Sequence, residues 1–345
     1  MREIPSRNDL ARGEIINGLV DHATKLSRRK FLHVAAGAAT FPALSRNAGA
    51  QAYPTRPVRI VVGFPAGAGP DIVARLVAQF LSERLGQQFV VDNRPGAGGN
   101  IGTEVVVKAP SDGHTLLFVT TANTINASLY DRLNFDFARD IAPIGTIART
   151  SFVMVVNPTV PAKTLPEFVA YAKANPGKIN MASQGNGSMN HVAGELFKTM
   201  SGTDMLHVPY RGNPMPDLLG GQVQVFFSPI STAIGNIRAG TLRPLAVTTK
   251  ARLEALPEVP TIAEFVPGYE ASAWNGIGSP TNTPPEIIEK INREIIAGLS
   301  DLKIKARIAD IGSVPLPTAT AEFRQLIADE IQKWGKVVKL AGIKP

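Results

Sequence analysis

The stretch GFPAGAGPDIVAR, residues 63–75, decides the fold class of this chain. It follows an apolar run of strand type, VRIVV at residues 58–62, and leads into apolar residues spaced as on one face of a helix. The order is therefore strand, glycine-rich loop, helix. Backbone N–H groups at a helix start carry partial positive charge and attract anions. The stretch predicts either an anion site or a tight connection that needs glycine for its backbone angles.

The same alternation of strand and helix continues along the chain. Strands are predicted at residues 58–64, 89–93, 114–120, 152–157, 178–183, 205–210, 223–228, 242–249 and 274–280. Helices are predicted at residues 72–81, 101–109, 166–174, 190–200, 284–299, 302–311 and 320–342. This α/β alternation favours a mostly parallel sheet that is covered on both faces. Because a second series of strands begins near residue 152, we expect two α/β units and a helical tail.

The N-terminal residues predict export. SRRKFL, at residues 27–32, precedes a weakly apolar stretch rich in Ala and Gly, which ends at Ala50-Gln51-Ala52. Paired arginines, such a stretch and a small-x-small end are typical of a twin-arginine signal, here residues 1–52, that is cleaved after Ala52. We therefore expect a periplasmic protein. The alternative is that the segment is not a signal but a short helix of a cytosolic protein. The absence of cysteine excludes disulfides and thiolate chemistry.

The charge of the remaining chain is mild. Residues 53–345 hold 28 Lys and Arg against 24 Asp and Glu, whereas the whole chain holds 36 against 28. The sequence has no block of Lys and Arg and no interleaving of basic with aromatic residues, so we expect no nucleic acid partner. A slightly positive surface suits small anions.

The sequence carries no nucleotide, cofactor or metal motif. A P-loop needs Lys followed by Ser or Thr after its glycines, and residues 63–75 have neither pair. A dinucleotide loop needs the pattern G-x-G-x-x-G. In residues 63–75 the position of the third glycine is occupied by Ile72. In NRPGAGGNIG, residues 93–102, the same position is occupied by Ile101. The three histidines after residue 52 lie outside the zinc patterns. We therefore expect no cofactor and no metal, and we interpret residues 93–102 as a structural turn.

Two polar segments end strands and offer candidate ligand contacts. TTANTIN, residues 120–126, ends a strand of the first unit, and SQGNGSMNH, residues 183–191, ends a strand of the second unit and starts a helix. Open α/β sheets bind ligands at the carboxyl ends of their strands. The two segments therefore suggest a cleft between two lobes; the alternative is two unrelated polar turns. Arg211 follows another strand and is either a partner for a ligand carboxylate or a surface residue.

The sequence shows no clear catalytic constellation. Ser183 and Ser188 lie outside the G-x-S-x-G elbow of hydrolases, and the carboxylates form no evident acid–base pair. His114 and His191, at the starts of a strand and a helix, are interpreted as structural. We therefore expect a protein that is not an enzyme, and we keep an exported hydrolase with a Ser–His pair, using Ser183 or Ser188 with a histidine such as His207, as the alternative.

Motifs along nearly all of residues 53–345 resemble the Bug family, the periplasmic solute-binding receptors of tripartite tricarboxylate transporters. Besides residues 63–75, they are VVDNRPGAGGNIGTEVVVKAPSDGHTLL (90–117), SQGNGSMNHVAGELFKTMSGTDMLHVPYRG (183–212), DLLGGQVQVFFS (217–228), IRAGTLRPLAVTT (237–249), LPEVPTIAEFVPGYEASAWNGI (256–277) and KWGKVVKLAGIKP (333–345). The resemblance implies a type II periplasmic binding protein fold, with two lobes that are each a central sheet flanked by helices. The ligand is then held in the interlobe cleft.

The resemblance also implies an organisation and a function. We place lobe 1 at residues 53–152 plus 278–345 and lobe 2 at residues 153–277. The expected protein captures a small carboxylate, either a di- or tricarboxylate or an aromatic acid. It is expected to be a monomer that docks to the membrane permease subunits of its transporter. A periplasmic carboxylate sensor subunit is a further alternative.

The resemblance finally implies that backbone N–H groups of two strand–helix loops hold the ligand carboxylate. Carried over to this chain, the candidate ligand-binding residues are Phe64, Ala66, Gly67, Ala68, Gly69, Asp71, Thr121, Asn123, Asn126, Ser183, Asn186, Ser188, Asn190, Arg211 and Ser228. We expect Asp71 to cap the helix more than to touch the ligand. Many family members have a PPGG loop where this chain has Pro65-Ala66-Gly67-Ala68. Many also carry an aspartate, which would meet a ligand ammonium, in place of Ser228, so we expect a carboxylate without an amino group.

Overall fold

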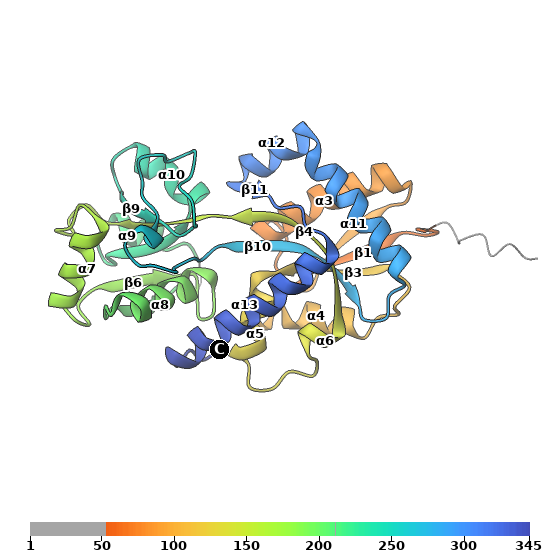
Figure 1. The fold of residues 1–345 in the computed structure, drawn as a ribbon, viewed down its shortest axis with the longest axis horizontal. Helices are drawn as coiled ribbons and strands as arrows, with labels where there is room; N and C mark the ends of the chain where they lie inside the picture. Colours follow the sequence, from red (N-terminus) through yellow and green to blue (C-terminus); the bar gives the residue numbers. More distant parts are fainter. Residues whose placement is uncertain (1–52, 211) are drawn as a thin grey trace, which may run out of the picture. The chain divides into compact units, whose positions relative to one another are not determined.

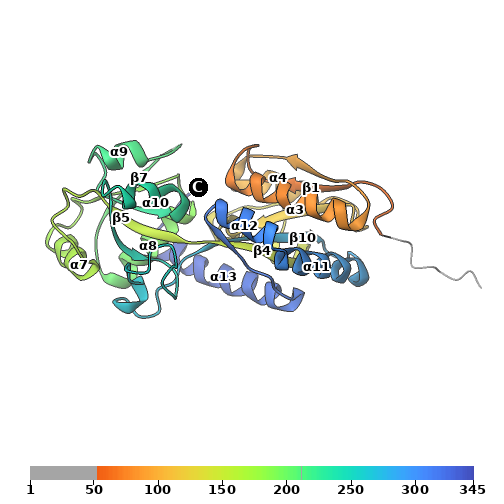
Figure 2. The same cartoon turned by 90° about the horizontal axis from the view of Figure 1, so that it is seen from above.

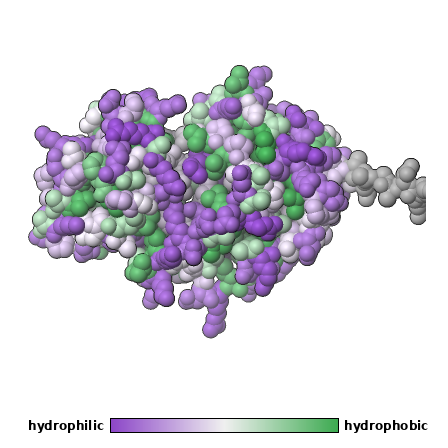
Figure 3. Space-filling view, in the orientation of Figure 1, coloured by the Kyte–Doolittle hydropathy of each residue, from purple (hydrophilic) through white to green (hydrophobic). Residues whose placement is uncertain are grey.

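The computed structural model describes residues 53–210 and 212–345. The expected export signal and Arg211 lie outside the described residues. The described residues form two β-sheets with helices packed against them (Figure 1). Within these two ranges, no helix is both long and apolar enough to cross a membrane. On the face drawn in Figure 3, hydrophobic residues are scattered among hydrophilic ones.

The first sheet has six strands in the order β11-β4-β10-β3-β1-β2. Their bounds are β1 (Val58–Val62), β2 (Phe89–Asn93), β3 (Thr115–Thr120), β4 (Ile141–Thr150), β10 (Ala273–Pro280) and β11 (Ser313–Pro315). Strand β1 pairs in parallel with β2 and β3. Strand β10 pairs antiparallel with β3 and with β4, and β11 pairs antiparallel with β4. The expectation of a mostly parallel sheet is therefore wrong beyond β3, because β10 returns along the sheet in the opposite direction.

The second sheet has five strands in the order β7-β6-β8-β5-β9. Their bounds are β5 (Phe152–Val156), β6 (Asn180–Ser183), β7 (Leu206–Pro209), β8 (Val225–Pro229) and β9 (Arg243–Val247). Strand β6 pairs in parallel with β7 and β8, whereas β5 pairs antiparallel with β8 and β9. The chain passes from the first sheet to the second between Thr150 and Phe152 and returns through β10, which lies beside β4 (Figure 2).

Helices follow most of the strands. Their bounds are α3 (Gly69–Leu85), α4 (Asn100–Val107), α5 (Thr121–Leu129), α6 (Phe137–Asp140), α7 (Leu165–Ala174), α8 (Met189–Ser201), α9 (Met215–Leu219), α10 (Ile230–Arg238), α11 (Pro285–Ser300), α12 (Leu302–Asp310) and α13 (Thr320–Leu340), with short 3-10 helices η1 (Ala97–Gly99) and η2 (Ile262–Glu264). The predicted helices lie within or over α3, α4, α7, α8, α11, α12 and α13. Pro70 and Pro285 occupy first-turn positions, where a missing backbone N–H costs nothing.

Successive residues of the central strands enter different hydrophobic clusters. In β1, Ile60 packs in a cluster with residues of α3 and α11, whereas Val61 packs in a cluster with Phe323 of α13. In β5, Met154 and Val155 divide in the same way between two clusters. Because neighbouring side chains of a strand point to opposite faces, both sheets are covered on both faces, as the sequence predicts.

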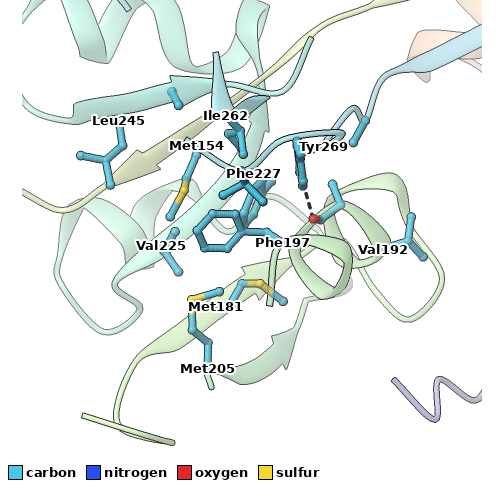
Figure 4. Packing of buried hydrophobic residues seen from close by; sticks show 14 of the residues in the cluster. Met154, Met181, Val192, Phe197, Met205, Val225, Phe227, Leu245, Ile262 and Tyr269 are labelled. Carbon is cyan, nitrogen blue, oxygen red and sulfur yellow. Dashed lines mark hydrogen bonds between the residues drawn. The ribbon is translucent and has the colours of Figure 1, made fainter. Parts of the chain in front are cut away.

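One of these clusters lies against the second sheet and is drawn in Figure 4. The ring of Phe197, from α8, packs against the rings of Phe227 and Tyr269, with centroid distances of 5.8 and 6.3 Å. Trp334 of α13 belongs to this cluster, whereas Phe323, near the start of α13, belongs to a cluster of the first sheet. Helix α13 therefore stabilises the cores of both sheets.

Residues 120–126, predicted as a polar loop at the end of a strand, instead continue into helix α5. Ile125 and Leu129 of this helix are buried in the hydrophobic cluster of the second sheet. Asn123 and Asn126 are buried as well, because their amides are bonded within the protein; the Asn126 amide donates to the Gly98 carbonyl oxygen at 2.9 Å. The polar composition of this segment suggested a loop. The segment forms a helix instead, because partners distant in sequence satisfy the hydrogen bonds of its buried polar side chains.

Candidate ligand-binding site

Both sheets contribute to a cavity of about 500 Å³, which is within the usual range for small-molecule sites. It lies at the carboxyl ends of β1, β3, β6 and β8. Its lining residues are Phe64, Gly69, Pro70, Ile72, Val73, Thr120, Thr121, Ala122, Ile125, Thr150, Phe152, Gln184, Gly187, Ser188, Met189, Asn190, Pro229, Ser231, Thr232, Ala273, Trp274, Asn275, Ile311 and Ser313. None of these lining residues has a charged or ionisable side chain.

Four helices begin at this cavity. Gly69 is the first residue of α3, Thr121 of α5 and Met189 of α8, and Ser231 lies in the first turn of α10. Helices α5 and α10 follow directly after β3 and β8, and α3 and α8 follow β1 and β6 after short loops, so the arrangement comes from the strand–helix order of the sequence. Helix N-termini carry positive partial charge, and four of them around one cavity favour an anionic ligand.

The start of α3 is fixed by Asp71, which is buried in the first helical turn. Its carboxylate accepts hydrogen bonds from the Gly67 backbone N–H at 2.8 Å and from the side chains of Arg75 and Asn93, each at 2.9 Å. Burial acts to raise the pKa of Asp71, but these donors outweigh it and hold the pKa below its usual value. Asp71 is therefore a structural anion that shapes the loop. The expectation that it caps the helix is not met as stated, because the N-cap residue is Ala68 and Asp71 accepts from Gly67, which precedes it.

The bonds made by Asp71 determine which N–H groups remain for a ligand. The Gly67 N–H is taken by Asp71, and the Ala68 N–H donates to the Pro65 carbonyl oxygen at 3.2 Å. The backbone N–H groups of Gly69 and Asp71 have no hydrogen-bond acceptor among the described residues. Because Gly69 lines the cavity, the first turn of α3 offers it unpaired donors.

The start of α8 is arranged in a similar way. The Gly187 N–H donates to Nδ1 of His191 at 3.2 Å, and the Ser188 N–H donates to the Gly185 carbonyl oxygen at 3.2 Å. The N–H groups of Met189 and Asn190 find no acceptor within the described ranges, and both residues line the cavity. The starts of α3 and α8 therefore both present unpaired backbone donors to the cavity, from Gly69 at α3 and from Met189 and Asn190 at α8.

Two stacked histidines lie behind the loop that precedes α8. The rings of His191 and His207 have centroids 3.5 Å apart and an interplanar angle of 8°. Burial lowers the pKa of His191 to about 3, with a further contribution from His207, and lowers the pKa of His207 to about 4. Both rings are therefore neutral near pH 7, and a neutral ring nitrogen can accept the hydrogen bond that the loop donates.

The same pair bears on the hydrolase alternative. Oγ of Ser183 lies 2.6 Å from Nε2 of His207, so the structure does contain a Ser–His contact. Ser183 is fully buried and does not line the cavity. Ser188 does line the cavity, but its hydroxyl donates to the Gly185 carbonyl oxygen at 2.7 Å rather than to His207. The contact therefore fixes the loop and does not present a nucleophile to the cavity.

The two glycine-rich loops of the first lobe pack against each other. A Cβ atom on Gly63 would lie 2.6 Å from Cα and 2.9 Å from the carbonyl oxygen of Gly99, and Gly99 itself has φ of 98°. Glycine at both positions permits this backbone contact, which positions the loop before α3. Of residues 93–102, none lines the cavity, which supports their interpretation as a structural turn.

The predicted ligand-binding residues divide into three groups. Those that line the cavity are Phe64, Gly69, Thr121, Ser188 and Asn190. Those that lie in the same loops and elements without lining it are Ala66, Gly67, Ala68, Asp71, Asn123, Asn126, Ser183, Asn186 and Ser228. Arg211 lies outside the described residues. The hydroxyl of Ser228, at the end of β8, is fully buried and donates to the Pro229 carbonyl oxygen at 3.1 Å.

Other lining residues were not singled out from the sequence. Trp274 and Asn275 come from β10, and Ser231 and Thr232 come from α10. Strand β10 reaches the cavity because it pairs with β3, which places Asn275 opposite Thr120. The segment WNGI carried part of the family resemblance, and this was the signal that could have pointed to these residues.

Comparison with known sequences identifies the family. The sequence profile of the tripartite tricarboxylate transporter family receptor, TctC, matches residues 73–343. The chain belongs to this receptor family. Protein BugT of Bordetella pertussis is 36% identical to it over 300 residues, which cover 86% of this chain and 92% of BugT. The predicted resemblance to the Bug family is therefore confirmed.

Solved structures of similar chains have the same fold. A protein of R. palustris solved with adipate is 37% identical and superposes with a TM-score of 0.74, covering 85% of this chain and 99% of that one. MatC from Rhodopseudomonas palustris with bound malate is 30% identical, with a TM-score of 0.71 and coverage of 83% and 100%. The two-lobed periplasmic binding protein fold is confirmed, as is the predicted class of function, a solute-binding receptor of a tripartite tricarboxylate transporter.

Proposed function

We propose that this chain is a periplasmic receptor that captures a small carboxylate in the cavity and delivers it to the membrane permease subunits of its transporter. The observation that carries the proposal is the cavity itself, where four helix N-termini open onto a lining that holds no charged side chain among the described residues. The proteins similar to this chain that were solved with adipate and with malate support a carboxylate as the ligand.

The donors proposed to hold the carboxylate are backbone N–H groups. Gly69 supplies one from the first lobe, and Met189 and Asn190 supply them from the second. Closure of the lobes would exclude water and strengthen each hydrogen bond to the anion. In this proposal Gly67 and Asp71 shape the first loop, and the hydrogen bond from the Gly67 backbone N–H to the Asp71 carboxylate keeps the start of α3 in place.

The apolar residues of the lining indicate what kind of group lies between or beside the ligand's carboxylates. Phe64, Phe152 and Trp274 line the cavity together with several aliphatic side chains. This apolar lining favours either an aliphatic chain between carboxylates or the ring of an aromatic acid. Ser228 supplies no anionic partner for an ammonium, which supports a ligand without an amino group. Tight binding of glutamate or aspartate, without a response to di- or tricarboxylates or aromatic acids, would contradict that part of the proposal.

We propose that the hinge lies where the chain crosses between the sheets, at Ser151 and along β10. The two lobes are then residues 53–152 with 278–345 and residues 153–277. We also propose export through the twin-arginine signal, cleavage after Ala52 and a monomeric mature protein. N-terminal sequencing of protein isolated from the periplasm tests the cleavage site, and a signal with Arg28 and Arg29 both changed to Lys should block export.

The test of the proposed function is a thermal-shift screen of the purified protein against carboxylic acids, followed by calorimetry. A bound ligand stabilises the folded state by about 2.7 kcal/mol at a hundredfold excess over its Kd. We expect stoichiometric binding and recovery of the ligand unchanged after long incubation. If the ligand is hydrolysed, and Ser183→Ala abolishes hydrolysis while binding persists, the hydrolase alternative is correct instead.

A further inference from the structure

Asn275 occupies a central place in the cavity. It lies on β10, opposite Thr120 of β3 on one side and Ala148 of β4 on the other. Only 8% of the residue's surface is exposed, and the residue lines the cavity. It therefore lies on the crossing strand between the two lobes, next to where a ligand would be held.

The side-chain oxygen of Asn275 is buried without a hydrogen-bond partner among the described residues. The other described side chains with a buried, unpartnered polar atom are Asn100, His114, Arg149 and Ser279, and none of them lines the cavity. A buried polar group without a partner destabilises the folded protein. Among the described residues that line the cavity, Asn275 is thus the one whose side chain has a buried polar atom without a hydrogen-bond partner.

Other polar side chains of the lining are engaged inside the protein. The Thr121 hydroxyl bonds the backbone of Trp274, accepting its N–H at 2.8 Å and lying 3.2 Å from its carbonyl oxygen. The Asn190 amide donates to the Phe227 carbonyl oxygen of β8 at 2.8 Å. The hydroxyls of Thr150 and Ser313 lie 2.8 Å apart and bond each other. Asn275 differs from these side chains because its amide makes no hydrogen bond among the described residues, and it differs from the unbonded side chains of Gln184, Ser231 and Thr232 because its oxygen is buried.

The chemistry of an amide limits what can pair with it. The oxygen of an amide accepts hydrogen bonds and its nitrogen donates them. A carboxylate only accepts, so it cannot satisfy the buried oxygen, and an ammonium only donates. A hydroxyl both donates and accepts, and it therefore satisfies the Asn275 amide whichever end faces the ligand. The backbone donors of α3 and α8 remain available for the carboxylate.

We propose that Asn275 is a specificity-determining residue that selects a carboxylate bearing a hydroxyl group over the same acid without it. The inference rests on the proposed function, because it assumes that the cavity binds a carboxylate. A site built to bond a ligand hydroxyl rejects the analogue that lacks it, since the protein group is then left buried and unpaired. The hydroxyl lies on the ligand's body, and the carboxylate is held at the helix starts.

Calorimetry with matched acids tests the inference. The probes are three pairs that differ by one hydroxyl: succinate and malate, adipate and 2-hydroxyadipate, and 3-phenylpropionate and 3-phenyllactate. We expect the hydroxy acid to bind about tenfold or more tightly than its partner in at least one pair, as one extra hydrogen bond implies. In Asn275→Leu and Asn275→Ala, that preference should fall below about threefold.

The control is Ser279→Ala, which removes another buried, unpartnered group from the same strand but away from the cavity. It should leave the preference for the hydroxy acid unchanged. The melting temperatures of the ligand-free variants give a second readout, because loss of an unpaired buried amide should leave stability equal or higher. A lower melting temperature for both Asn275 variants would instead assign the residue a structural role and overturn the inference.

The outcomes separate the inference from the proposed function. If acids bind but no pair differs by more than threefold, the inference is wrong and the proposed function stands. If a preference exists and persists in both Asn275 variants, the inference is also wrong, and another residue reads the hydroxyl. If none of the six acids binds, the proposed function fails together with the inference.

Discussion

The contact between the two glycine-rich loops predicts a sharp effect of Gly63→Ala. The new Cβ would meet the Gly99 backbone at 2.6 and 2.9 Å, whereas carbon atoms pack best at about 3.5–4.0 Å. Backbone cannot rotate away as a side chain can, so one of the two loops has to move by close to 1 Å. Forcing extra volume into a packed site costs about 1–3 kcal/mol. At roughly 2–4 °C per kcal/mol for a chain of this order of size, the melting temperature should fall by about 5 °C.

Two nearby glycines, Gly67 in the same loop and Gly69 at the start of α3, separate this steric effect from backbone strain. Gly67 has φ of 79° and open space around it, so Gly67→Ala should cost about 1 kcal/mol through its backbone angle alone. Gly69 has open space and no such angle, so Gly69→Ala should change stability by less than about 0.5 kcal/mol or raise it. Thermal and urea denaturation of the three variants give the order. The reasoning is refuted if Gly63→Ala melts at or above the temperature of Gly69→Ala.

Three further predictions follow from the contacts around the cavity. Asp71→Asn should lower the melting temperature at pH 7, because the depressed pKa of Asp71 means that its charged form stabilises the fold; the difference from the parent protein should shrink as the pH falls below about 4. The neutral, low-pKa pair His191 and His207 should give stability that is full above about pH 6.5 and is lost as the pH falls toward 4, because the unfolded chain then binds protons that the folded rings exclude. The variant His191→Asn with His207→Gln, which keeps acceptor atoms near the ring nitrogens, should flatten that profile, and an unchanged profile would show that other groups cause it. Ligand binding should change the fluorescence of Trp274, which lines the cavity, so the signal should survive Trp334→Phe and disappear in Trp274→Phe; the opposite result would place the ligand elsewhere.

The sequence predicts those parts of the fold in which neighbours in the chain are neighbours in space. β1, the glycine loop and α3 form one local unit, and their apolar periodicity specifies both elements. A local structural role for Asp71 was predicted, as a helix cap, whereas its bond to Gly67, four residues away, was not. Family motifs then supplied the two-lobed arrangement, which no local pattern contains.

The sequence does not predict what depends on distant pairing. Strand β10 lies beside β3 although about 150 residues separate them, and this pairing brings Trp274 and Asn275 to the cavity. Helix α5 was not predicted, because asparagines such as Asn123 and Asn126 are typical of loops. Their hydrogen-bond partners, Thr103 and Gly98, are distant in sequence and become evident only in the folded structure. For the same reason several predicted contacts, such as Ser183, are bonded inside the protein and do not line the cavity.

The most direct test of the central claim is a crystal structure of the protein with the carboxylate that calorimetry finds to bind most tightly. The account predicts the carboxylate oxygens within about 2.7–3.1 Å of backbone N–H groups at the starts of α3 or α8, in the cavity between the sheets. A carboxylate held mainly by a charged side chain, or bound outside this cavity, would contradict it.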